Sequence, residues 1–171
     1  IRGQLTLEQD WGFRADLDTN QENHTVLNQA FGTAYFNVSQ DASELNYLVV
    51  ADQLSGAITG AHLHTGAKGV DGPVALNLTT GVNGNVIKGS VQTSTAPGLV
   101  ANMLLGNVYV NIHTTANPNG EIRGQLWIDK NIAFDAELNT AQEVPAPTGA
   151  NGNGVAYYSF NSTFDTLTYS V

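Results

Sequence analysis

An identical pentapeptide, Ile-Arg-Gly-Gln-Leu, occurs at both 1–5 and 122–126. Further correspondences follow it in the same order: 13–17 with 134–138 and, after a one-residue slip, 32–36 with 154–158. The slip falls in a loop, where insertions are tolerated. A repeat of this kind indicates copies of one structural unit. We therefore expect the terminal strand of a preceding repeat (1–11), one complete repeat (12–131) and the opening strands of a following repeat (132–171).

The composition of the chain favours strands and turns over helices. Of 171 residues, 18 are glycine and only six are lysine or arginine. Apolar and polar residues alternate over short runs, which is typical of half-buried strands. These predicted strands cover residues 12–17, 32–38, 44–51, 57–64, 74–78, 86–93, 108–113 and 121–128, and one helix is predicted at 97–105. This pattern predicts an all-β fold, a Greek-key sandwich or barrel with one short helix.

Charge and cysteine content exclude several functions. The formal net charge of -9 disfavours contact with nucleic acid or with anionic membrane surfaces. No apolar run approaches the roughly 18 residues of a membrane span. The chain has no cysteine, so a bound metal must take its ligands from histidine, carboxylate or carbonyl groups.

Three of the four histidines lie on predicted strands. His62 and His64 are two residues apart, so they share one face of their strand, opposite the apolar residues. His113 shares the outward face of 108–113 with Tyr109 and Asn111. If the two strands are neighbours, three imidazoles converge and form a site for copper, with zinc as the competitor. The alternative is that all three are surface histidines.

The inward-facing residues of the same strands form the predicted core. This set comprises Leu63, Val74, Leu76, Val108, Val110 and Ile112.

Two further residues are candidates for additional metal ligands. Asp71 follows the strand of His62 and His64 and would supply an oxygen ligand or orient an imidazole, although a turn-forming role is the alternative. His24 lies in a predicted loop, and the alternative is a loop residue outside the site. Glu121 and Arg123 alternate onto one face of the last strand, which predicts a surface ion pair worth under about 1 kcal/mol.

Several segments around the histidines resemble the CHRD domain, a module first named in chordin and common in bacterial secreted proteins. They are Gly60–Ala67, Gly69–Val74, Gly106–Thr114 and Asn117–Leu126. The resemblance extends over residues 12–128. It implies a secreted β-sandwich, so we expect the chain to be extracellular or on the cell surface. Chordin members of the family belong to proteins that bind growth factors.

The histidine pattern is also similar to that of copper/zinc superoxide dismutases. Those enzymes hold copper on the outside of a Greek-key barrel, with a His-x-His pair on one strand and a late histidine on its neighbour. His62, His64 and His113 occupy similar places. The chain has no counterpart of the bridging histidine, the zinc-ligand cluster or the disulfide pair of that family.

Three classes of function follow from these patterns. The first is an extracellular copper-binding structural repeat protein that self-associates head to tail into a filament, through neighbouring repeats or strand exchange. The second is a redox enzyme of the superoxide dismutase type, and the third is a metal-free adhesion or ligand-binding module. No Ser-His-Asp order, phosphate loop or close carboxylate pair stands out. We therefore assign no catalytic or organic-cofactor residues and favour a function without catalysis.

Overall fold

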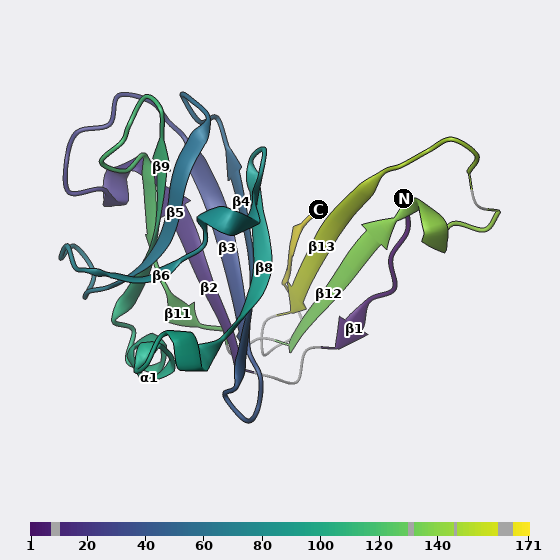
Figure 1. Cartoon of the computed structure of the whole chain (residues 1–171), viewed down its shortest axis with the longest axis horizontal. Helices are drawn as coiled ribbons and strands as arrows, with labels where there is room; N and C mark the ends of the chain where they lie inside the picture. Colours follow the sequence, from purple (N-terminus) through teal and green to yellow (C-terminus); the bar gives the residue numbers. More distant parts are fainter. Residues whose placement is uncertain (8–10, 130–131, 146, 161–165) are drawn as a thin grey trace. The chain divides into compact units, whose positions relative to one another are not determined.

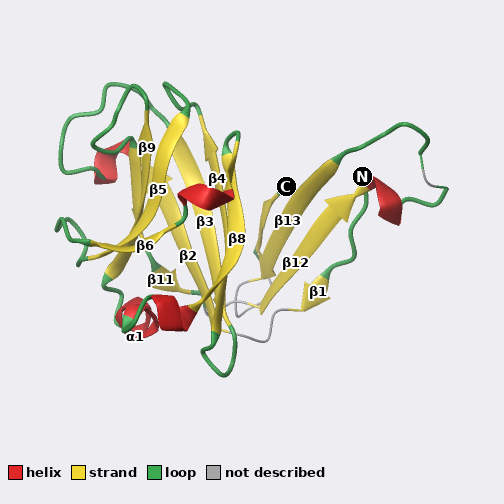
Figure 2. Cartoon of the chain, viewed as in Figure 1, coloured by secondary structure: helices red, strands yellow, loops and turns green. Residues whose placement is uncertain are grey.

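The computed structural model describes residues 1–7, 11–129, 132–145, 147–160 and 166–171 (Figure 1). The chain divides into two compact units, one formed by residues 10–129 and the other by 1–9 together with 130–171. The regular secondary structure of each unit consists mainly of antiparallel strands (Figure 2). The all-β prediction is confirmed.

The larger unit is one strongly curled antiparallel sheet. Its strand order is β6-β5-β9-β10-β2-β3-β4-β8-β7, with β11 also pairing with β2. The elements are β2 (Trp11–Asp18), β3 (Phe31–Val38), β4 (Glu44–Asp52), β5 (Ile58–Thr65), β6 (Val74–Asn77), β7 (Val82–Asn83), β8 (Val86–Gln92), α1 (Leu99–Leu104), β9 (Val108–Thr114), β10 (Ile122–Gln125) and β11 (Trp127–Ile128). β5 lies beside β9 and not beside β4, which precedes it in the chain. This crossover brings the two histidine-bearing strands together.

Strand and turn chemistry explain most of these boundaries. β3 and β4 are joined by a turn in which the Asp41 carboxylate accepts hydrogen bonds from Ser39 and Ser43. β7 and β8 are joined at Asn83-Gly84, where Gly84 has a φ of 60°. Helix α1 begins at Leu99, two residues later than predicted, because Gly98 adopts a left-handed conformation with a φ of 80°.

In the described residues, no helix is long and apolar enough to span a bilayer.

The core of the larger unit lies against the concave side of the sheet. Four of the six predicted core residues are fully buried: Leu63, Val108, Val110 and Ile112. Leu76 is partly buried against the same core. The prediction for Val74 was wrong, since 54% of this residue is exposed. Val74 lies on β6 at the edge of the sheet, where the β5/β6 register shifts between Leu63 and His64 and breaks the alternation.

The smaller unit is a four-stranded sheet of order β1-β12-β13-β14. Its elements are β1 (Thr6–Leu7), β12 (Ile132–Asn139), β13 (Asn153–Phe160) and β14 (Leu167–Ser170). The pairing Arg2↔Asn139 occupies the position of Arg123↔Asp18 in the larger unit. Tyr158↔Tyr169 likewise occupies the position of Phe36↔Tyr47. The strands of the smaller sheet are thus paired in the same registers as strands β10, β11, β2, β3 and β4 of the larger unit.

Candidate metal centre

Strands β5 and β9 bring three imidazoles together on the outer face of the larger sheet. The potential ligand atoms of His62, His64 and His113 all lie within 4.8 Å of one another. The ring centroids of His62 and His113 are 4.9 Å apart, and those of His62 and His64 are 5.7 Å apart. The β5/β9 pairing places Gly60 opposite His113 and Asn111 opposite His62, so the three rings form a triangle across the two strands.

Backbone carbonyls determine which nitrogen of two histidines is free. His64 Nδ1 lies 2.9 Å from the carbonyl oxygen of Gly72, and His113 Nδ1 lies 3.1 Å from that of Pro118. A carbonyl oxygen only accepts hydrogen bonds, so each Nδ1 carries the proton and each Nε2 keeps a lone pair. Such a contact is the usual way in which a metal-binding histidine is oriented.

The free nitrogens of the cluster are buried without a hydrogen-bond partner. They are Nε2 of His64, Nε2 of His113 and Nδ1 of His62. An unpaired buried acceptor costs free energy, roughly 1–3 kcal/mol per group. Three such acceptors side by side form a site that a cation with nitrogen preference would satisfy.

The electrostatics of the cluster favour the neutral form of two of its imidazoles, those of His62 and His113. Burial lowers the pKa of His62, and the neighbouring His113 and His64 lower it further. Burial also lowers the pKa of His113, against the opposing effect of the Pro118 carbonyl. Neutral imidazoles are the form that coordinates metal.

The two additional ligand candidates lie outside the cluster. The Asp71 side chain is 75% exposed and accepts hydrogen bonds from Arg123 Nη1 at 2.8 Å and Asn23 Nδ2 at 2.7 Å. His24 Nε2 lies 3.0 Å from the carbonyl oxygen of Gly120. Neither side chain belongs to the group of potential ligands that the described residues bring together.

Loops cover the outer face beside the histidines, which overturns the predicted surface pair of Glu121 and Arg123. Only 2% of Arg123 is exposed, and its partner is Asp71. Glu121 is fully buried and accepts hydrogen bonds from Thr114, Asn28 and the Ser55 amide. Alternation placed both residues on the outward face, but it does not reveal which loops fold over that face.

The model of the CHRD domain family matches residues 13–126, more than half of the chain. The chain belongs to the CHRD domain family. No curated protein and no solved structure is significantly similar to it. The matched residues include every histidine of the cluster and the strands that carry them. The candidate metal centre is therefore a feature of the CHRD domain of this chain.

A buried carboxylate beside the histidines of the CHRD domain was missed by sequence reasoning. Only 3% of the Glu22 side chain is exposed, and Asn111 Nδ2 donates to its Oε2 at 3.4 Å. Burial raises the pKa of Glu22 to about 7, although His24 and Arg123 oppose the increase. Nothing in the local sequence marks Glu22, because its neighbours include Asn111 on β9 and Gly120, which are distant in the chain.

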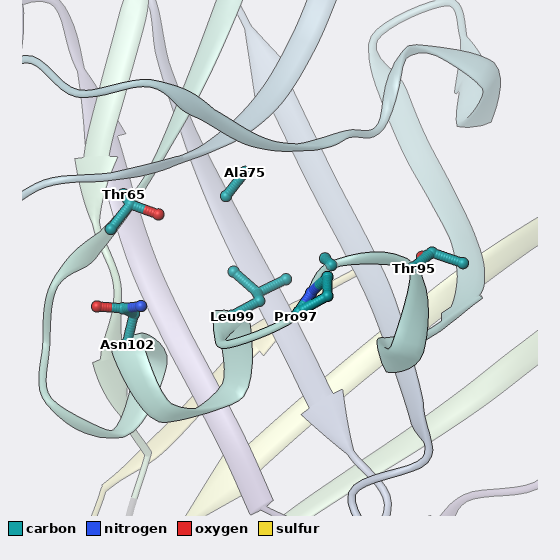
Figure 3. A pocket seen from close by; sticks show the side chains of 7 residues that line it. Thr65, Ala75, Thr95, Pro97, Leu99 and Asn102 are labelled. Carbon is teal, nitrogen blue, oxygen red and sulfur yellow. The ribbon is translucent and has the colours of Figure 1, made fainter.

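The CHRD domain also has a small cavity away from the histidine rings (Figure 3). Its volume is about 220 Å³, and it lies between α1, β6 and the end of β5. The lining residues are Thr65, Ala75, Thr95, Ala96, Pro97, Leu99 and Asn102. None of these carries a titratable group, so the cavity offers no acid–base chemistry and no preferred metal ligand.

Proposed function

We propose that this CHRD domain is an extracellular-type module that binds copper through His62, His64 and His113. The observation that carries the proposal is the convergence of three buried, unpartnered imidazole nitrogens within 4.8 Å. CHRD domains occur in extracellular proteins, and this supports the extracellular location in the proposal. Asp71 and His24 are left out of the proposed ligand set because neither belongs to the group of potential ligand atoms that lie within 4.8 Å of one another.

An all-imidazole ligand set favours copper over harder cations. Imidazole suits copper and zinc, whereas calcium and magnesium prefer oxygen ligands. Cu(II) exceeds Zn(II) in the usual order of affinities, so copper is the expected occupant and zinc the competitor. Three protein ligands leave at least one coordination position for water or another small ligand.

Copper titration at pH 7 tests the proposal directly. The wild-type chain is expected to bind one copper, and the His64→Ala variant is expected to lose this stoichiometric uptake. His24→Ala is the matched control, because His24 lies near the cluster but outside it and should leave uptake unchanged. Undiminished copper binding by His64→Ala would contradict the ligand assignment.

The same preparation separates the two remaining classes of function. Superoxide turnover by the copper-loaded chain would identify a redox enzyme of the dismutase type, whereas uptake without turnover supports a structural or metal-holding role. If the wild-type chain binds no copper, the metal-free ligand-binding class replaces the proposal.

We further propose that the chain self-associates through the edge strand β14, with a second copy as the partner. Leu167 and Tyr169 on β14 are 46% and 67% exposed. Their counterparts on β4 of the larger unit, Leu45 and Tyr47, are buried, and β4 also pairs with β8. Among the described strands, β14 pairs only with β13. A strand from another copy would supply main-chain hydrogen bonds and cover these side chains, and a head-to-tail contact that does not close gives a filament.

Light scattering across a concentration series tests this association. The wild-type chain is expected to form elongated assemblies whose mass grows with concentration. Tyr169→Glu should reduce them, because a carboxylate would be placed in the covered face. Leu27→Glu is the matched control, since Leu27 is an exposed apolar residue (96% exposed) that lies in a loop and on no sheet edge. A monomeric wild-type chain at all concentrations would refute the proposal.

A further inference from the structure

The side chains of His64, Tyr109 and Arg123, on the neighbouring strands β5, β9 and β10, stack on one another in that order. His64 on β5 and Tyr109 on β9 are paired across the sheet, and their rings lie 4.9 Å apart at an interplanar angle of 10°. On the other side of Tyr109, the Arg123 guanidinium carbon lies 3.5 Å from the ring centroid. A guanidinium over an aromatic face is attracted by the ring quadrupole, and more strongly when it is removed from water. Tyr109 and Arg123 are each 2% exposed.

Arg123 also holds the loop that joins β5 to β6. Its Nη2 donates to the carbonyl oxygen of Val70 at 2.8 Å, and its Nη1 donates to the Asp71 carboxylate at 2.8 Å. The Gly72 amide donates to the Tyr109 hydroxyl at 3.1 Å. The guanidinium and the phenol therefore hold three successive residues of the loop.

The same loop supplies the hydrogen-bond acceptor of His64. The Gly72 carbonyl binds His64 Nδ1, and this contact leaves His64 Nε2 free to face the other imidazoles. The loop passes so close to β5 that a Cβ on Gly72 would lie 1.7 Å from the carbonyl oxygen of Thr65. The position of the Gly72 carbonyl thus depends on the contacts that hold Val70 and Asp71.

We propose that Arg123 is a positioning residue for the metal centre. It presses Tyr109 against His64 and fixes the loop at Val70 and Asp71, so that the Gly72 carbonyl orients the imidazole. This inference rests on the proposed copper site. Arg123 acts on the three proposed histidine ligands through Tyr109 and the loop. Lysine cannot replace it, because one ammonium group cannot donate to both loop acceptors in a fixed fork and also lie flat on the ring.

The test compares Arg123→Met with Arg14→Met. Arg14 is a matched control: it lies 5.9 Å from the centroid of Tyr35 and pairs with Asp16 at 2.7 Å, away from the histidines. In Arg123→Met, copper affinity measured against a competing chelator is expected to fall by about 10- to 100-fold. The electron paramagnetic resonance spectrum of bound Cu(II) should also change. Arg123→Lys should fail to restore either property, and Arg14→Met should match the wild type in both.

A second variant that perturbs the fold less keeps the test decisive if Arg123→Met folds poorly. Asp71→Asn removes only the charge of an exposed partner, so it should fold and produce a smaller change of the same kind. The inference is overturned if the wild type binds copper while Arg123→Met, or Asp71→Asn as its substitute, shows the wild-type affinity and spectrum. In that case the copper proposal stands. Failure of the wild type to bind copper refutes the copper proposal itself.

Discussion

Gly60 lies directly opposite His113 across the β5/β9 pair, and a Cβ at position 60 would lie 3.3 Å from His113 Cδ2. The same Cβ would lie 3.1 Å from Cε1 of His62. Both separations are shorter than ordinary van der Waals contact between carbon atoms. The absence of a side chain at position 60 therefore lets the two imidazoles approach each other.

Gly60→Ala is expected to lower copper affinity by about tenfold, which corresponds to about 1.4 kcal/mol. The added methyl group would push His62 and His113 apart while leaving all three ligands in place. Titration against a competing chelator measures the change. Gly12→Ala is the control, since the nearest atoms to its new Cβ are 3.8 Å away. Equal affinities in the two variants would show that the spacing of the imidazoles is unimportant.

Acid should weaken both copper binding and the metal-free fold. The pKa values of His62 and His113 are lowered in the folded chain, so the unfolded chain binds protons at these residues at higher pH than the folded chain does. Their stabilising contribution is fully present above an ordinary histidine pKa of about 6.5 and is lost as pH falls through the lowered folded values. Copper should be released over the same range, because protons compete for the ligand nitrogens.

Urea unfolding and copper retention at pH 7.5, 6.5 and 5.5 measure these effects. His62→Gln removes one of the titrating groups and should flatten the pH dependence of metal-free stability. An identical pH dependence in His62→Gln and wild type would contradict the role assigned to this residue.

Glu22→Gln is expected to stabilise the fold in alkaline solution. The folded pKa of Glu22 is about 7, above the ordinary value of 4.5. Its stabilising contribution is therefore complete below about pH 4.5 and is lost as pH rises through 7. Glutamine stays neutral, so the variant should exceed the wild type by roughly 1–2 kcal/mol at pH 8 and match it at pH 4. A variant less stable than the wild type at pH 8 would show that the ionised carboxylate is favourable.

Glu121→Gln should destabilise the larger unit by about 2–4 kcal/mol. Burial favours the neutral form of Glu121, but hydrogen bonds from Thr114, Ser55 and Asn28 together outweigh it and lower the pKa. An amide NH2 would face at least one of these donors and leave it unpaired. Chemical denaturation measures the loss, with Glu44→Gln on β4 as a less buried control. Equal stability of the two variants would contradict the importance of this buried carboxylate.

The sequence determined the strands, the turns and the faces of the histidines. Period-two alternation predicted β2, β3, β4, β5, β8 and β9 to within one or two residues, because a half-buried strand imposes that pattern locally. It also placed His62, His64 and His113 on outward faces. The resemblance of the motifs identified the family that the matched residues confirm.

Tertiary structure alone decided which residues surround the cluster. Arg123 shares the outward face with Tyr109, and Glu121 lies one residue before β10, yet contacts from elsewhere in the chain bury both. Burial raises the pKa of Glu22 to about 7, and its neighbours Asn111 and Gly120 are distant in sequence. Val74 is exposed because β6 forms the sheet edge, where the register shifts. Alternation reports which side of a strand a residue faces, whereas burial on that side depends on segments far away in the chain, so a local pattern does not contain it.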